Sequence, residues 1–166
     1  EDRAADLRKE GSDLVRERNA LIDERNDLAK RGGKISGDDH RLRCQIATLV
    51  GLDPSDLPFV AELFDLAPEH EDWRVAADAV LRGFATQLII DNAHYNHVRD
   101  ILNPHQFAKR FRFIGADSHV EIRYDANPGT LAETLIVERS SQWAGWLHKQ
   151  LLREANHLRV DDVTAL

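Results

Sequence analysis

The first 35 residues carry a repeat that favours one long helix over most other structures. In a segment made largely of charged residues, four leucines recur at intervals of seven: Leu7, Leu14, Leu21 and Leu28. A seven-residue apolar repeat forms a narrow stripe along one side of a helix, as in a coiled coil. The neighbouring seam positions hold Gly11, Arg18 and Arg25, which pack poorly, so the partner helix is expected elsewhere in the protein. We therefore predict a coiled-coil arm stub over residues 1–35, with a single solvated terminal helix as the alternative.

The boundaries of this stub follow from helix-breaking and helix-capping residues. Gly32 and Gly33 each cost a helix interior about 1 kcal/mol relative to alanine, so the arm is expected to end near residue 35. A globular domain is then expected over residues 36–162. Asp161 and Asp162 are typical N-cap residues, which predicts that a returning helix begins over residues 163–166. The expected partner of the stub is this antiparallel arm of the same chain.

The charge balance argues against general attraction to nucleic acid. The chain has 22 basic and 29 acidic residues, a net charge of −7. Residues 1–35 contain nine of each sign, so the globular part carries the whole negative charge. Only a local basic patch could reverse the repulsion between such a domain and a phosphate backbone.

Other features of composition concern the cellular setting. No apolar run approaches the roughly 18 residues that a membrane helix needs, so no membrane partner is expected. The single cysteine, Cys44, cannot form an internal disulfide; we expect a buried thiol and a cytoplasmic protein. Methionine is absent even from position 1, which indicates a piece of a longer protein.

From residue 57 onward the pattern alternates between strands and helices. Strands are predicted over residues 59–66, 87–90, 107–114, 119–124, 131–137 and 158–160. Helices are predicted over residues 40–50, between 73 and 84, from a cap at Asp91 to Leu102, and around Trp143 to Leu151. This order predicts the α/β (mixed α+β) class, with one mixed sheet covered by helices.

A search for catalytic and metal-binding patterns predicts no such site. Phosphate-binding glycine motifs, the G-x-S-x-G elbow and HExxH are all missing from the sequence. His94 and His97 are spaced to share a metal on one helix face, flanked by Asp91 and Asp100, but solvated helix positions explain them better. The acidic pairs Glu69 with Glu71, and Asp161 with Asp162, are explained as dipole and capping residues. We expect no catalytic, cofactor-binding or metal-binding residue.

The densest basic cluster of the domain is Lys109, Arg110 and Arg112. It alternates with three phenylalanines: Phe107, Phe111 and Phe113. A strand that presents these charges outward could contact DNA, whereas its phenylalanines would face the core and be unavailable for base stacking. The alternative is an ordinary solvated strand face that protects a sheet edge.

Three stretches of the sequence resemble a known ATPase family. They are LPFVAEL (residues 57–63), DWRVAADAVLRGFATQLII (72–90) and WAGWLHKQLLREANHLRVDD (143–162). Together they resemble the middle region of the SMC-like ATPase of bacterial Wadjet or MksBEF systems, called MksB, JetC or EptC. The resemblance covers about residues 40–162.

The resemblance implies a mechanical role. In that family the ATPase head is split between the ends of the chain, the arms are antiparallel coiled coils and a central hinge dimerises. The chain would then be a homodimerisation hinge with an arm stub, in a nucleoid-associated complex that recognises circular plasmid DNA. It would not itself be an enzyme, since ATP and Mg would bind at the head. The glycine-rich motif of ordinary SMC hinges is not visible here, so the dimer interface stays unassigned.

Two other functions compete with the hinge on the sequence alone. One is a DNA-contacting module that uses the basic strand, either alone or together with dimerisation. The other is a small α/β enzyme of unknown reaction, which has support only at the level of fold class.

Overall fold

The computed structural model describes Arg18 and residues 35–122 and 125–160. The chain divides into two units, Glu1–His40 and Arg41–Leu166. Arg18 is helical; the rest of the predicted arm, up to residue 34, and the predicted returning helix over residues 163–166 lie outside the described residues. Most of the described residues therefore belong to the unit Arg41–Leu166.

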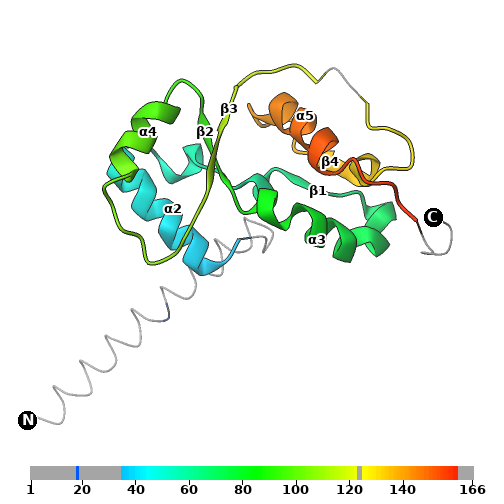
Figure 1. Ribbon diagram of the computed structural model, residues 1–166, viewed down its shortest axis with the longest axis horizontal. Helices are drawn as coiled ribbons and strands as arrows, with labels where there is room; N and C mark the ends of the chain where they lie inside the picture. The colour runs from blue at the N-terminus through cyan, green and yellow to red at the C-terminus, as the bar shows by residue number, and fades with distance from the viewer. Residues whose placement is uncertain (1–17, 19–34, 123–124, 161–166) are drawn as a thin grey trace, which may run out of the picture. The chain divides into compact units, whose positions relative to one another are not determined.

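The described part of the chain contains four α-helices and four short strands, joined by 3₁₀ turns (Figure 1). The helices are α2 (Gly37–Val50), α3 (Arg74–Ala85), α4 (Tyr95–Leu102) and α5 (Ala144–Glu154). The strands are β1 (Phe64–Leu66), β2 (Leu88–Asp91), β3 (Phe113–Ala116) and β4 (Leu135–Val137). The 3₁₀ turns are η1 (Pro54–Asp56), η2 (Val60–Glu62), η3 (Pro68–Trp73) and η4 (Leu131–Thr134). The mixed α/β class predicted from the sequence is confirmed.

The strands form two small sheets, whereas the sequence predicts one mixed sheet. β1 pairs antiparallel with β4, with Asp65 opposite Ile136, and β2 pairs parallel with β3, with Ile89 opposite Ile114. The second edge of β2 is also occupied, because the Ile89 N–H donates to the Pro58 carbonyl at 2.8 Å. These backbone bonds give β2 hydrogen-bond partners along both edges, and its residues Leu88, Ile89 and Ile90 are buried.

Several predicted strands are wrong in extent. Residues 59–66 begin with the 3₁₀ turn η2 before β1, and residues 131–137 begin with η4 before β4. In the predicted strand 107–114 only Phe113 and Ile114 join a ladder. Residues 119–122 form no strand, and in residues 158–160 only Leu158 makes an isolated bridge, to Thr130. Apolar alternation marks surfaces to bury, but a strand also needs a partner backbone, which the pattern does not supply.

The main core lies between α3 and α5. Leu81 and Phe84 of α3 face Trp146 and Leu147 of α5, and the rings of Phe84 and Trp146 are 6.4 Å apart. The helices predicted for these segments are confirmed, and Trp143, Trp146, Leu147 and Leu151 are all buried. Val80 is 40% exposed, although it shares the three- and four-residue spacing of the buried face of α3.

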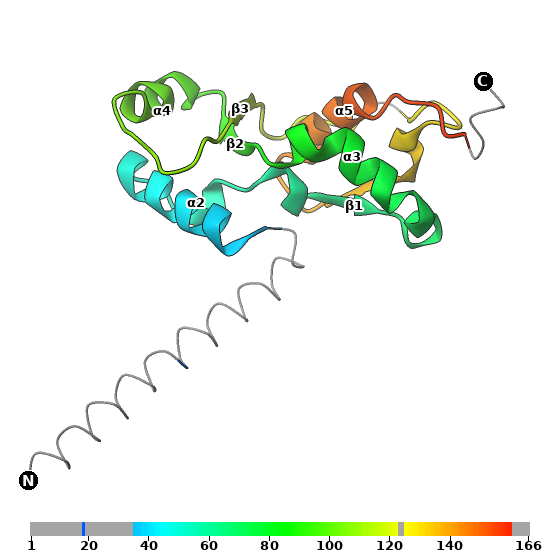
Figure 2. The same ribbon diagram turned by 60° about the horizontal axis from the view of Figure 1, so that its bottom comes forward.

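At the other end of the unit, α2 and α4 contribute a second set of buried side chains. Leu42 and Ile46 of α2 and Val98 and Leu102 of α4 are buried, while Cys44 is only half-buried. Asp91 does not cap α4 as predicted. It ends β2, and its Oδ1 accepts a hydrogen bond from the Ala93 N–H at 2.8 Å. Figures 1 and 2 both show α2 and α4 at one end of the unit and the segment after α5 at the other.

A largely buried ion pair ties α2 to the turn η2. Arg43 donates from Nη1 to Glu62 Oε2 at 2.6 Å, and the side chains are only 9% and 14% exposed. The same Glu62 oxygen accepts the Phe59 N–H at 2.9 Å, and the Arg43 guanidinium lies 5.7 Å from the Phe59 ring centroid. The Glu62 carboxylate thus joins α2 to the backbone at the start of η2, and the guanidinium that it holds lies near the Phe59 ring.

Candidate functional site

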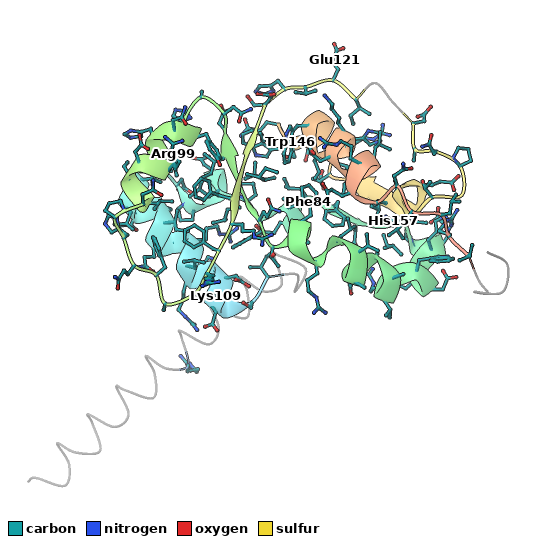
Figure 3. The ribbon with its side chains drawn as sticks, in the orientation of Figure 1. Phe84, Arg99, Lys109, Glu121, Trp146 and His157 are labelled. Atoms are coloured by element: carbon teal, nitrogen blue, oxygen red, sulfur yellow. The ribbon has the colours of Figure 1, made fainter. Side chains whose placement is uncertain are left out.

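The basic residues singled out from the sequence lie on the irregular segment between α4 and β3. Lys109, Arg110 and Arg112 are all exposed, and Figure 3 shows Lys109 at the bend of this segment. The Leu88 N–H donates to the Arg112 carbonyl at 3.0 Å, which fixes the backbone immediately before β3. Among the described residues, neither Arg110 nor Arg112 has an acidic side chain within ion-pair distance. The structure therefore brings the three predicted cations together on the surface, although not on a strand.

A row of five aromatic rings accompanies these cations. Tyr95 contacts Phe113 with ring centroids 5.3 Å apart, and Phe113 contacts Phe111 at 6.2 Å. Phe111 meets Phe107 edge to face at 4.9 Å, and Phe107 lies 6.4 Å from His105. We call His105, Phe107, Phe111, Phe113 and Tyr95 the aromatic row. Edge-to-face and tilted rings at 4.5–7 Å attract one another through their quadrupoles, so the row supports its own geometry.

The row corrects the prediction that the three phenylalanines face the core. Phe107, Phe111 and Phe113 are half-buried, and none of them belongs to the main core cluster of the described residues. Because the ladder of β3 begins only at Phe113, the two preceding phenylalanines have no sheet to cover, and they pack against each other instead. The sequence pattern did not point to Tyr95 or His105. The sequence feature that points to these two residues is the number of aromatic and histidine side chains on both sides of Pro104, next to the basic cluster.

This arrangement is suited to a strand of nucleic acid. Proteins that bind single strands combine cations that track the backbone with aromatic side chains on which bases stack. Here the cations are exposed and the neighbouring rings keep part of their surface accessible. The local charge opposes the net charge of the domain, which is negative.

The two histidines that were considered as metal ligands, His94 and His97, lie on the surface. His94 precedes α4 and His97 lies within it, and both are exposed, as are Asp100 and most of the polar face around them. Asp100 accepts hydrogen bonds from Arg99 at 3.0 and 3.1 Å. Across the described residues no group of three or more His, Cys, Asp or Glu side chains could hold a metal ion.

The acidic residues at η3 take part in a structural ion pair. Arg74 donates to Glu71, with Nη2 2.7 Å from Oε2, and to Asp65 at 3.3 Å. The hydrogen bond from Arg74 lowers the pKa of Glu71, and the bond to Glu71 in turn raises the pKa of Arg74. Glu69 is exposed in the same turn, and Asp161 and Asp162 lie outside the described residues. These contacts fix the start of α3 and give the carboxylates a structural role.

Within the described ranges, no helix combines the length and the apolar character needed to cross a bilayer.

The three stretches that resemble the SMC-like ATPase fall on η2 with its flanks, on α3 with β2, and on α5 with the segment after it. These elements contribute to the main core and supply strand β2 of the β2–β3 sheet. No family model, curated protein or solved structure matches the chain.

Proposed function

We propose that this chain is the homodimerisation hinge of an SMC-like ATPase from a Wadjet-type or MksBEF complex. The carrying observation is the organisation of the chain: Arg41–Leu166 forms one compact unit with its own core, separate from the unit that contains the leucine repeat. A hinge needs this arrangement, because it must be a self-contained body at the end of an arm. The three resembling stretches lie on the elements that build that core.

The surface of the unit also supports self-association. Among the described residues seven large apolar side chains are exposed, and five of them lie on β4 or outside the helices and strands: Val120, Ile122, Ile136, Leu158 and Val160. Their exposed fractions range from 37% to 71%. Single exposed apolar residues are common, but several of them on one unit offer apolar surface that a second protein chain can cover.

The charged groups with resolved contacts have structural roles, which favours a mechanical function over a reaction. Arg43 and Glu62 tie α2 to η2, and Arg74 joins η3 to β1. Arg159 bonds Glu133 at 2.6 Å and lies over the Trp73 ring, so it ties the last described segment to η4 and η3.

The first test asks where self-association occurs. Multi-angle light scattering on the chain is expected to give twice the 18.9 kDa of one copy. Leu14→Glu with Leu21→Glu breaks the leucine stripe and serves as the control, since a hinge dimer should survive it. A monomer at about 100 μM, or a dimer lost in the stripe variant, would contradict the proposal.

The second test concerns the arms. A hinge requires the entering and leaving segments to run side by side, and packed helices have axes 8–10 Å apart. In Figures 1 and 2, α2 and the segment after α5 lie at different ends of the unit, so a paired stalk requires one of the two flanking segments to run back along the unit. We expect spin labels at Lys30 and Thr164, in a Cys44→Ala background, to give a distance below about 20 Å because the arms pair. A distance above about 40 Å would exclude a paired stalk.

A second candidate function, contact with DNA, is favoured by the aromatic row beside exposed cations. We expect the chain to bind single-stranded DNA, with a salt dependence of about 0.7 in log K per log salt for each phosphate neutralised. Replacing Lys109, Arg110 and Arg112 with glutamate should lower that slope by about 2.

A matched control separates this local effect from net charge. Arg139, Lys149 and Arg153 are exposed on other elements, and their replacement with glutamate changes the net charge equally. DNA contact by the basic segment predicts that the control variant keeps most of the salt slope. Equal slopes in the two variants and the unaltered chain would refute it.

A further inference from the structure

The segment after α5 lies along the turn that leads into η4 (Figure 1). The Leu131 N–H donates to the His157 carbonyl at 2.9 Å, and the Arg159 N–H donates to the Gly129 carbonyl at 2.9 Å. An isolated antiparallel bridge lies between these two bonds. We call residues 156–160 the strap. Its backbone is held against the turn by the same kind of hydrogen bonds that pair two strands.

The turn that receives the strap is fixed by its own sequence. It consists of Asn127, Pro128, Gly129 and Thr130, and the glycine has a φ of 78°, as at the third position of a type II turn. The Thr130 N–H donates to the Asn127 carbonyl at 3.2 Å, and the Thr130 hydroxyl donates to the same carbonyl at 2.7 Å. None of these contacts involves the strap, so the turn should keep its shape when the strap leaves it.

One side chain of the strap is anchored, and the other four are exposed. Arg159 donates from Nη2 to Glu133 at 2.6 Å, and its guanidinium lies 5.8 Å from the centroid of the Trp73 ring. The Asn156 side chain accepts a hydrogen bond from Asn127 at 3.2 Å, at an exposed site where water competes for both groups. A segment with few buried apolar contacts opens at a lower cost in free energy than the core does. Arg159 is therefore the clasp that keeps the strap closed.

The clasp also carries an unfavourable contribution. The Arg159 Nε is buried and has no hydrogen-bond partner among the described residues. A buried donor without a partner has given up its hydrogen bond to water, and it recovers that bond only when the strap opens. The bond to Glu133 and the contact with the ring oppose this effect. The closed and open positions are thus closer in free energy than the bond to Glu133 alone would indicate.

We propose that the strap opens and closes on the turn as a unit of its own, with Arg159 as the clasp, while the α3–α5 core stays folded. A pull on the chain beyond residue 160 acts on the strap first, because the bonds to the turn lie between that chain and α5. In the proposed hinge, the strap would be the point at which the leaving segment separates from the unit. Opening takes place within one copy, so a chain that stays monomeric would contradict the hinge and leave the strap unaffected.

Native-state amide exchange, measured by NMR, tests the strap in the unaltered chain. The Leu131 and Arg159 amides bond across the contact between strap and turn, whereas the Leu147 amide donates to the Trp143 carbonyl at 2.8 Å in buried α5. A strap that opens alone predicts one shared protection factor for Leu131 and Arg159, at least about tenfold below that of Leu147. Equal protection of Leu131 and Leu147 would mean that the strap opens only when the whole unit unfolds, and it would overturn the proposal.

Removal of the clasp should loosen the strap alone. Arg159→Ala is expected to speed exchange at Leu131 at least about tenfold and to leave Leu147 unchanged, because the strap loses its anchored side chain. Arg139→Ala removes the same charge from an exposed arginine outside the strap and should change neither rate. Arg159→Lys keeps a charge next to Glu133 and should give an intermediate rate. If Leu131 exchanges equally fast in Arg159→Ala and in the Arg139→Ala control, Arg159 is not the clasp and the proposal is overturned.

Discussion

Replacing Gly145 with alanine is expected to destabilise the fold, whereas the same change at Gly83 is expected to stabilise it. Both glycines lie in helices, α5 and α3, where alanine is favoured over glycine by about 0.5–1 kcal/mol. The two sites differ in the room that is available for an added methyl group. A Cβ on Gly83 meets no atom within 4 Å, but one on Gly145 would lie 1.7 Å from the carbonyl oxygen of Val120 and 2.4 Å from its carbonyl carbon.

The clash at Gly145 involves backbone atoms, so relief requires the segment from His119 to Ile122 to move. Overpacking of this kind costs about 1–3 kcal/mol, which outweighs the gain in helix propensity near a helix start. We expect Gly145→Ala to lose about 1–2 kcal/mol in the free energy of unfolding and Gly83→Ala to gain about 0.5–1 kcal/mol. For a chain of this size 1 kcal/mol shifts Tm by about 2–4 °C, so the variants should differ by about 3 °C or more.

Urea unfolding followed by tryptophan fluorescence measures the difference, since Trp143 and Trp146 flank Gly145 and are buried. All proteins are compared at one concentration, because self-association adds stability by mass action. A Gly145→Ala chain as stable as the unaltered one, or as stable as Gly83→Ala, would refute the close approach of the Val120 backbone to α5.

Three further changes probe the packing and electrostatics of the unit. Arg43→Ala should cost about 3–5 kcal/mol in urea unfolding, because it leaves Glu62 charged and largely buried without its guanidinium; a cost below about 1 kcal/mol would contradict this. The hydrogen bond from Arg74 lowers the pKa of Glu71, so this carboxylate stabilises the fold above its ordinary pKa of 4.5, and that contribution is lost as pH falls through the lower folded value. The urea midpoint of Glu71→Gln should therefore lie below that of the unaltered chain at neutral pH and approach it in acid, and a gap independent of pH would disprove the linkage. Trp146→Ala should cost about 3–5 kcal/mol by opening a cavity in the core, measured by the same unfolding, and a near-neutral result would argue against the α3–α5 core.

The helices can be predicted from the sequence because their signal is local. Leu81 and Phe84 in α3, and Trp143, Leu147 and Leu151 in and beside α5, repeat at three- and four-residue steps, and the structure buries all of them. The start of α4 is harder to predict, since an aspartate after a strand can cap a helix or bond to a turn. Asp91 bonds to the turn that follows β2.

The strands are harder still to predict because pairing is not local. Residues 107–114 alternate as a strand should, yet the chain supplies a partner only from Phe113 onward, where β2 lies beside it. The aromatic row could not be predicted for the same reason. Phe107 and Phe111 have no paired strand to cover, so they pack on each other and stay half-buried. The close approach at Gly145 cannot be foreseen either, since a lone glycine in a helical pattern does not reveal which backbone it faces.

The central claim is that this unit joins two copies of its own chain. Sedimentation equilibrium of the chain over about 1–200 μM tests it most directly, because the mass is obtained without reference to shape. We predict a mass that rises with concentration to twice 18.9 kDa and stops there, as a closed two-fold contact requires. A mass of 18.9 kDa across the whole range, or one that grows without limit, would contradict the account.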